Sequence, residues 1–353
     1  SAGIGHMEEM HMGRKLLFSL ALALGLSHAQ AQTPPAADFY KGKDIHMLIS
    51  HPAGGGMDTY ARFFARHLSR FIPGNPTVIP QNMPGAAGIV MANSIASVQP
   101  NDGTYIAYGP GKIALSDLLG VPGARFDAAK FSYIGSMNSD VGIAMSWHTS
   151  PVKTADDLMK QELLVGAGGS TDQSNVFPTV LNRILGTKFK IVPGYAGTAA
   201  LFLAMERGEV NGIGGVNYSS LPAAKPEWLR DRKVKILLQT SRERDDDMKD
   251  VPTVFELAKT DEQRQILALI FSQSQLSRLV FAPPGLPPER LKILRDAFDA
   301  MVKDPTVLAE AKKQNIEINA PTSGTAIDEL LKSFRATSPA VIKKAAEAME
   351  LGK

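Results

Sequence analysis

The residues best suited to bind a ligand in this chain of 353 residues lie in glycine-rich turns. The first turn, PAGGGMD at residues 52–58, follows an apolar run at 45–49 and precedes an amphipathic pattern at 59–71. A strand, a glycine turn and a helix in this order expose unpaired N–H groups at the positive end of the helix dipole, which suits an anion. Glycine also lets a ligand approach the backbone closely. The turn therefore predicts half of a cleft for a small carboxylate.

Similar glycine turns recur at residues 84–88, 109–111, 166–169, 194–197 and 212–215. A single turn would be explained by the need for positive φ angles and helix caps alone. Recurrence at the ends of predicted strands favours one shared site instead. The candidate ligand-binding residues are His51, Ala53, Gly54, Gly55, Gly56, Met57, Asp58, Gly109, Pro110, Gly168, Gly169, Ser170, Thr171, Asp172, Tyr195, Ala196, Gly197, Thr198, Asn217 and Tyr218.

The turns contain no arginine, so we expect backbone N–H groups and the hydroxyls of Ser170, Thr171 and Thr198 to hold a carboxylate. Lys112 is the one cation next to these turns, and its type favours a surface position over ligand contact. Asp58 is interpreted as the cap of the helix that follows the first turn.

The sequence offers no set of catalytic or metal-binding residues. It lacks the motifs G-x-S-x-G, H-E-x-x-H and G-x-x-x-x-G-K-[ST], and it has no cysteine. The glycines from Gly166 begin like a dinucleotide motif, but Thr171 stands at its sixth position. The histidines are dispersed, and only His51 adjoins a glycine turn. We therefore expect no enzyme, no cofactor and no metal.

Alternating short strands and helices predict an α/β fold with a sheet covered on both faces, and with ligands at the carboxyl ends of the strands. Strands are expected at 45–49, 77–80, 105–108, 131–136, 141–146, 163–165, 189–192, 210–216, 234–239 and 279–282. The strand at 234–239 is expected to return the chain to the first domain. The pattern divides the chain into domain 1 (37–137 and 240–353) and domain 2 (138–239).

The N-terminal segment predicts export. Residues 1–11 resemble a remnant of an expression vector. Residues 12–31 have the form of a signal peptide, with Arg14 and Lys15, an apolar run of residues 16–26 and an A-x-A cleavage site. The apolar run is too short to span a membrane. The net charge of +3 comes from dispersed residues, which disfavours nucleic-acid binding.

Several segments together resemble the Bug-type (TctC-like) periplasmic solute-binding receptors of tripartite tricarboxylate transporters. The matching segments are PAGGGMDTYAR (52–62), QNMPGAAG (81–88), PNDGTY (100–105), GYAGTAA (194–200), VPTVFE (251–256) and APPGLP (282–287). The chain departs from the family pattern at Asn211, at residues 109–112 and in the block 260–278.

The resemblance implies a two-domain periplasmic-binding-protein fold of the flytrap, type II-like form, with mixed, mainly parallel sheets. It also implies capture of a small organic carboxylate (a di-, tri- or aromatic carboxylate) in an interdomain cleft, and delivery to the membrane permease subunits of the transporter. We expect a monomer in the periplasm. Two alternatives stay open: a sensing subunit for a membrane signalling partner, and an exported hydrolase.

Overall fold

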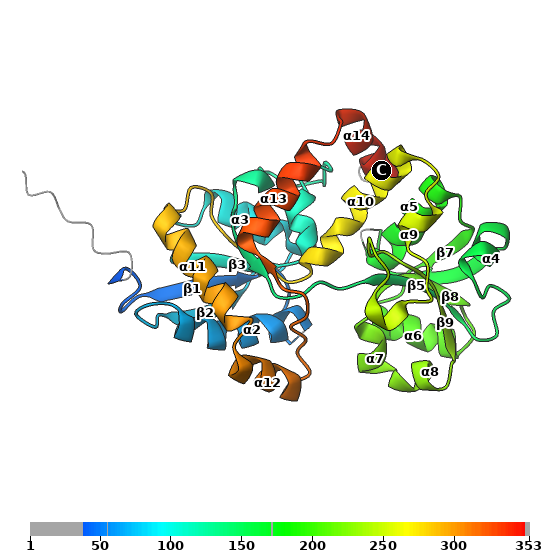
Figure 1. Ribbon diagram of the computed structural model, residues 1–353, viewed down its shortest axis with the longest axis horizontal. Coiled ribbons are helices and arrows are strands. Elements are labelled where there is room, and N and C mark those ends of the chain that lie inside the picture. The colour runs from blue at the N-terminus through cyan, green and yellow to red at the C-terminus, as the bar shows by residue number, and fades with distance from the viewer. Residues whose placement is uncertain (1–37, 55, 171, 350–353) are drawn as a thin grey trace, which may run out of the picture. The chain divides into compact units, whose positions relative to one another are not determined.

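The computed structural model describes residues 38–54, 56–170 and 172–349, and in this part of the chain the strands form two mixed sheets (Figure 1). The first sheet has the order β11-β4-β10-β3-β1-β2, and the second has the order β7-β6-β8-β5-β9. The bounds of the strands are β1 Asp44–Ile49, β2 Thr77–Asn82, β3 Tyr105–Gly109, β4 Ser132–Ser136, β5 Gly142–Trp147, β6 Leu163–Ala167, β7 Phe189–Pro193, β8 Gly212–Asn217, β9 Val234–Gln239, β10 Leu279–Ala282 and β11 Thr322–Ser323.

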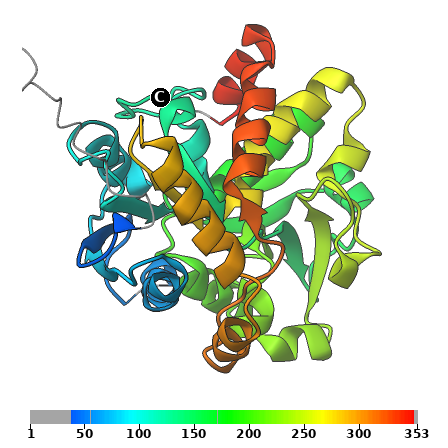
Figure 2. The same cartoon turned by 60° about the vertical axis from the view of Figure 1, so that its left-hand side comes forward.

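The helices connect the strands and cover the sheets. Their bounds are α2 Gly56–Leu68, α3 Ile89–Ser97, α4 Ala155–Lys160, α5 Gln173–Leu185, α6 Thr198–Glu206, α7 Ser220–Ala224, α8 Pro226–Arg230, α9 Val254–Leu257, α10 Asp261–Phe271, α11 Pro288–Met301, α12 Pro305–Lys313, α13 Gly324–Arg335 and α14 Pro339–Ala348. Helix α2 packs on β1 and β2, while α11 and α13 both pack against β4. These last two helices lie side by side in both views (Figures 1 and 2).

The centre of the first sheet is apolar because its strands are covered on both faces. Three of the four consecutive residues that end β1, Met47, Leu48 and Ile49, are buried, as expected for a central strand. The predicted stripe of α2, whose members include Ala61 and Phe64, is also buried. The local pattern thus places the glycine turn between β1 and α2 at the carboxyl end of a central strand.

Helix α10 joins the two sheets through its apolar face. Its N-terminus is fixed by a capping box in which Thr260 and Gln263 bond each other's backbone N–H groups. At its other end, the Phe271 ring packs edge-on against Phe177 of α5, with ring centroids 4.6 Å apart. Helix α14 packs on both α10 and α5, so the C-terminal helices cover the second sheet's α5 as well as the first sheet.

The two-sheet α/β fold is confirmed, and so is the mixed character of the sheets, but the parallel share is smaller than expected. Strand β1 pairs parallel with β2 and β3, and β6 pairs parallel with β7 and β8. The other pairings among the described strands are antiparallel. Strands that return from the other sheet, such as β10, enter in the reverse direction, and the alternation of strands and helices cannot reveal this.

The sequence predicted that strand β9 returns the chain to the first domain, and this prediction is wrong. It is an edge strand of the second sheet and pairs antiparallel with β5, so the return begins after Gln239. Strand β11 has only two residues and was not predicted. The domain boundaries at 137/138 and 239/240 stay a prediction. The proposed vector remnant (1–11) and signal peptide (12–31) lie outside the described residues.

Candidate functional site

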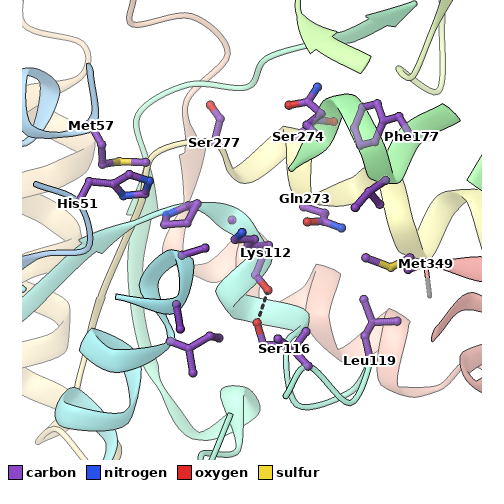
Figure 3. A pocket seen from close by; sticks show the side chains of 18 of the residues that line it. His51, Met57, Lys112, Ser116, Leu119, Phe177, Gln273, Ser274, Ser277 and Met349 are labelled. Carbon is purple, nitrogen blue, oxygen red and sulfur yellow. Dashed lines mark hydrogen bonds between the residues drawn. The ribbon is translucent and has the colours of Figure 1, made fainter. Parts of the chain in front are cut away.

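A cavity of about 440 Å³ is lined by segments of both sheets, and this volume falls in the range of small-molecule sites (Figure 3). The first sheet contributes residues after β1 and β3, and the second contributes α5 and the end of β8. The lining residues include His51, Met57, Ile89, Pro110, Lys112, Ser116, Leu119, Val121, Gln173, Val176, Phe177, Asn217, Gln273, Ser274, Ser277, Arg278 and Met349.

Lys112 lies in this wall on the short helical turn Gly111–Leu115, which follows β3. The residue before Lys112 is Gly111, and a side chain at this position would meet the backbone oxygens of Gln273 and Leu276 at 2.5 Å. Burial lowers the pKa of Lys112, and the negative charge of Asp172, at the start of α5, opposes that shift. The ammonium group is therefore partly desolvated, which strengthens its attraction for an anion.

Arg278 is the second cation of the wall and lies just before β10. Its guanidinium stacks over the Tyr60 ring, with Cζ 4.5 Å from the centroid, and its Nη1 donates to the Ser277 carbonyl at 3.0 Å. Asp140 and Glu317 also lie within electrostatic range; burial, the larger effect, raises the pKa of each, and Arg278 lowers it. The side chain is thus held in place by groups on several elements.

Two buried donors of the cavity residues have no partner among the described residues. They are Nε of Arg278 and Nε2 of Gln173, which is the first residue of α5. A buried donor without a hydrogen bond costs free energy, and a ligand acceptor would remove that cost. No aspartate or glutamate occurs among the described lining residues. The cavity can therefore donate hydrogen bonds to a ligand acceptor and can hold a negatively charged group.

His51 follows β1 and faces the cavity opposite Phe177 and Met349 (Figure 3). Burial lowers its pKa, and the positive charges of Lys112 and Arg278 lower it further. The ring is therefore neutral at pH 7, because even an unperturbed histidine has a pKa of about 6.5. Its Nδ1 lies 2.7 Å from the Ser50 hydroxyl. In the tautomer that accepts from Ser50, Nε2 carries the proton and can donate to a ligand.

The first glycine turn is held by Asp58, whose side chain is only 5% exposed. Its carboxylate accepts from the Gly54 backbone N–H at 2.9 Å, from Arg62 Nε at 3.0 Å and from Asn82 Nδ2 at 2.8 Å. Burial would raise the pKa of Asp58, but Arg62, Asn82 and Gly54 outweigh it and lower the value to about 2. Gly54 has a φ of 85°, a conformation that glycine adopts without strain.

The turn before α5 is also occupied by the chain's own side chains. Asp172 caps the helix by accepting from the Ser174 backbone N–H at 2.9 Å. The Ser174 hydroxyl in turn accepts from the Gly168 N–H at 2.9 Å. The carboxylate of Asp172 therefore already supplies the negative charge that the positive end of the α5 dipole attracts.

The turn before α6 differs, since Gly197 caps that helix without any side-chain hydrogen bond. Tyr195 of this turn packs beside Gly166, and the Tyr195 hydroxyl lies 3.5 Å from Glu209 Oε2. Neither Tyr195 nor Thr198 is among the residues that line the cavity.

Comparison with known proteins shows the family of the chain. The family model described as "Tripartite tricarboxylate transporter family receptor" matches residues 61–346, most of the chain. The chain belongs to this receptor family. It is 24% identical over 301 residues to a UPF0065 protein of Bordetella bronchiseptica, covering 83% of this chain and 81% of the relative. The suspected likeness to the Bug and TctC receptors is thus confirmed.

Solved structures share the receptor's fold. One is a TctC solute binding protein from Polaromonas, with a TM-score of 0.67 at 23% identity, covering 87% of this chain and 99% of the other. Another is Rpa4515 of R. palustris with adipate, with a TM-score of 0.59 at 20% identity, covering 87% of this chain and 97% of the other. At these identities the likeness shows the two-domain binding-protein fold.

The structure of this receptor brings some of the predicted site residues together and leaves others apart. His51, Met57, Pro110 and Asn217 line the cavity. The remaining described candidates do not, and Ala53, Gly54, Gly56, Gly169, Ser170, Asp172 and Ala196 are exposed to solvent. Gly55 and Thr171 lie outside the described residues. The assignment of all these residues to ligand binding stays a proposal.

Two expectations need correction, and one cavity residue was not predicted. Lys112 was interpreted as a surface lysine, but it lines the receptor's cavity because the turn after β3 points it inward. Asp58 lies in the first turn of α2 rather than at its cap, because α2 begins at Gly56. Arg278 was not predicted; the available signal was its place at the end of the block 260–278, which departs from the family pattern, directly before a buried strand.

Within the described part of the receptor, no group of three or more histidine, aspartate or glutamate side chains is arranged to hold a metal ion. Among these same residues, no helix has the length and apolar character needed to cross a membrane.

Proposed function

We propose that the chain is a periplasmic receptor that captures a small organic carboxylate between its two sheets and passes it to the membrane permease subunits of a tripartite transporter, without catalysis. The observation that carries this proposal is the cavity that contains Lys112 and Arg278 but no acidic lining residue. The family match supports the role of a transport receptor. The adipate bound to the R. palustris neighbour supports an organic acid as ligand.

The proposed ligand carboxylate accepts from Lys112 and from Arg278 Nε, which has no partner among the described residues. Hydrogen bonds between charged partners are about twice as strong as neutral ones. Gln173 adds a donor from α5, on the side of the second sheet. A ligand that is bonded from both sheets stabilises the arrangement in which the sheets approach each other, which is the flytrap movement.

The proposed receptor is a monomer in the periplasm, and the segment 12–31 supports its export. Monomeric state and permease contact are checked by the elution volume of purified protein and by cross-linking to the membrane subunits in intact cells.

The experiment is a thermal-shift screen followed by calorimetry, with C4–C9 dicarboxylates, aromatic and aliphatic monocarboxylates, citrate and acidic amino acids. A bound ligand raises the melting temperature because it binds only the folded state. Loss of one charged hydrogen bond costs about 1.5–3 kcal/mol, so R278Q and K112Q should each weaken binding roughly tenfold to a hundredfold. The matched control is K303Q, at an exposed lysine, which should bind like wild type. A screen in which no acid shifts the melting temperature refutes the proposal.

A further inference from the structure

The cavity is divided into a cationic end and an apolar compartment. The cationic end consists of Lys112 and Arg278, and the apolar compartment consists of Leu119, Val121, Val176, Phe177 and Met349. Figure 3 shows His51 and Met57 on one side, Leu119, Phe177 and Met349 on the other, and Lys112 between them. Lys112 thus lies between two groups of lining side chains, and one group combines the apolar Leu119, Phe177 and Met349 with the uncharged Gln273 and Ser274.

The apolar compartment is continuous with the protein's interior. Leu119, Val176 and Phe177 belong to one buried apolar core, and Met349 packs against it. This core includes Phe271 of α10, whose ring contacts Phe177. A ligand segment that enters here leaves water for an apolar surface, which favours CH₂ and aromatic groups.

Both cations line the cavity. Lys112 and Arg278 each lower the pKa of His51, so both lie within electrostatic range of one imidazole. The remaining polar groups of the described lining, such as Gln273 and Asn217, are uncharged. A second carboxylate in the apolar compartment would lose its hydration without meeting a cation among the described lining residues, and that is costly.

We infer that the ligand is a monocarboxylate with an apolar body, such as a medium-chain aliphatic or an arylalkanoic acid. Its carboxylate lies at Lys112 and Arg278. Its apolar body packs against Leu119, Phe177 and Met349. This inference rests on the proposed function and narrows its ligand class. It predicts that the protein binds such a monocarboxylate more tightly than a dicarboxylate of the same chain length.

The test compares octanoate with suberate, which has the same eight carbons and a second carboxylate, by calorimetry on the full-length protein, with 1-octanol as the uncharged control. Octanoate should bind at least tenfold more tightly than suberate, and 1-octanol should bind more weakly than octanoate. Equal or tighter binding of suberate overturns the inference. If suberate binding also depends on Arg278, the proposed function stands; if no carboxylate binds, both fail.

A variant tests the location of the apolar compartment. Met349 is the C-cap residue of α14, where a cation is compatible with the helix dipole, so M349K should fold. It places a positive charge in the apolar compartment and should reduce the preference for octanoate over suberate at least fivefold, whereas M349L should keep it. Melting temperatures of both variants check folding. An unchanged preference in folded M349K overturns the assignment of the ligand body to this compartment.

Discussion

Replacement of Asp58 by Asn tests how strongly the first glycine turn depends on one buried carboxylate. The carboxylate joins three donors, the Gly54 backbone, Arg62 and Asn82, within hydrogen-bonding distance. Asparagine keeps the size of the side chain but removes its charge. The variant therefore isolates the electrostatic part of the contact from its packing.

The magnitude follows from the pKa of Asp58, which falls from its ordinary value of 3.8 to about 2. One pKa unit corresponds to about 1.4 kcal/mol, so the charged form stabilises the fold by about 2 kcal/mol. A carboxyl group whose pKa is lowered by folding contributes its full stabilisation at pH values above its pKa in the unfolded chain. It loses that stabilisation as the pH falls toward its pKa in the folded protein. The contribution of Asp58 should be complete at pH 7 and about half as large at pH 3.

The assay is urea unfolding of wild type and D58N at pH 7 and pH 3. The difference in unfolding free energy should be about 2 kcal/mol at pH 7 and should shrink at pH 3. The matched control is D296N, since Asp296 also forms an ion pair four residues apart on a helix but is 64% exposed. Exposed pairs contribute little, so D296N should cost less than about 0.5 kcal/mol. A D58N difference below this value, or one that is equal at both pH values, refutes the electrostatic account.

Three further predictions concern the cavity and its support. G111A should destabilise the protein by about 1–3 kcal/mol in urea unfolding, because its methyl group would clash with the backbone of the segment 272–276. F271A should cost about 3–5 kcal/mol, because it removes a fully buried ring packed against Phe177; a cost below about 1 kcal/mol would contradict the role of α10 in joining the sheets. Because burial lowers the pKa of Lys112, carboxylate affinity should fall as the pH rises from 7 to 10, and calorimetry of K112Q should show a weaker pH dependence.

Much of the fold could be predicted because its signals are local. The apolar run that becomes β1, the stripe of α2 and the capping residue Thr154 of α4 depend on neighbours within a few positions. Strand order and direction depend on distant partners instead. Edge strand β9 and the antiparallel insertion of β10 therefore could not be derived from alternation alone.

The site was harder to predict because backbone donors in the turns before α2 and α5 have partners within the chain. The sequence shows Gly54 and Gly168 beside helix starts, but it does not show that Asp58 and Ser174 accept from their N–H groups. Likewise, Lys112 and Arg278 are far apart in sequence, and they line the same cavity because η7 (Ser272–Leu276) packs on the turn that carries Lys112.

This occupation of the turns decides which groups are free to recognise an anion. A ligand carboxylate at the start of α2 or α5 would compete with Asp58 or Asp172, each already bonded to the backbone there. Like charges at one helix start repel each other, so such a ligand would lose much of the dipole's attraction. Asp172 lies within electrostatic range of Lys112, and Asp140 and Glu317 lie within range of Arg278, but no acid occurs among the described lining residues of the cavity. Within the described lining, these two side-chain cations thus provide the positive charge that can attract an anion.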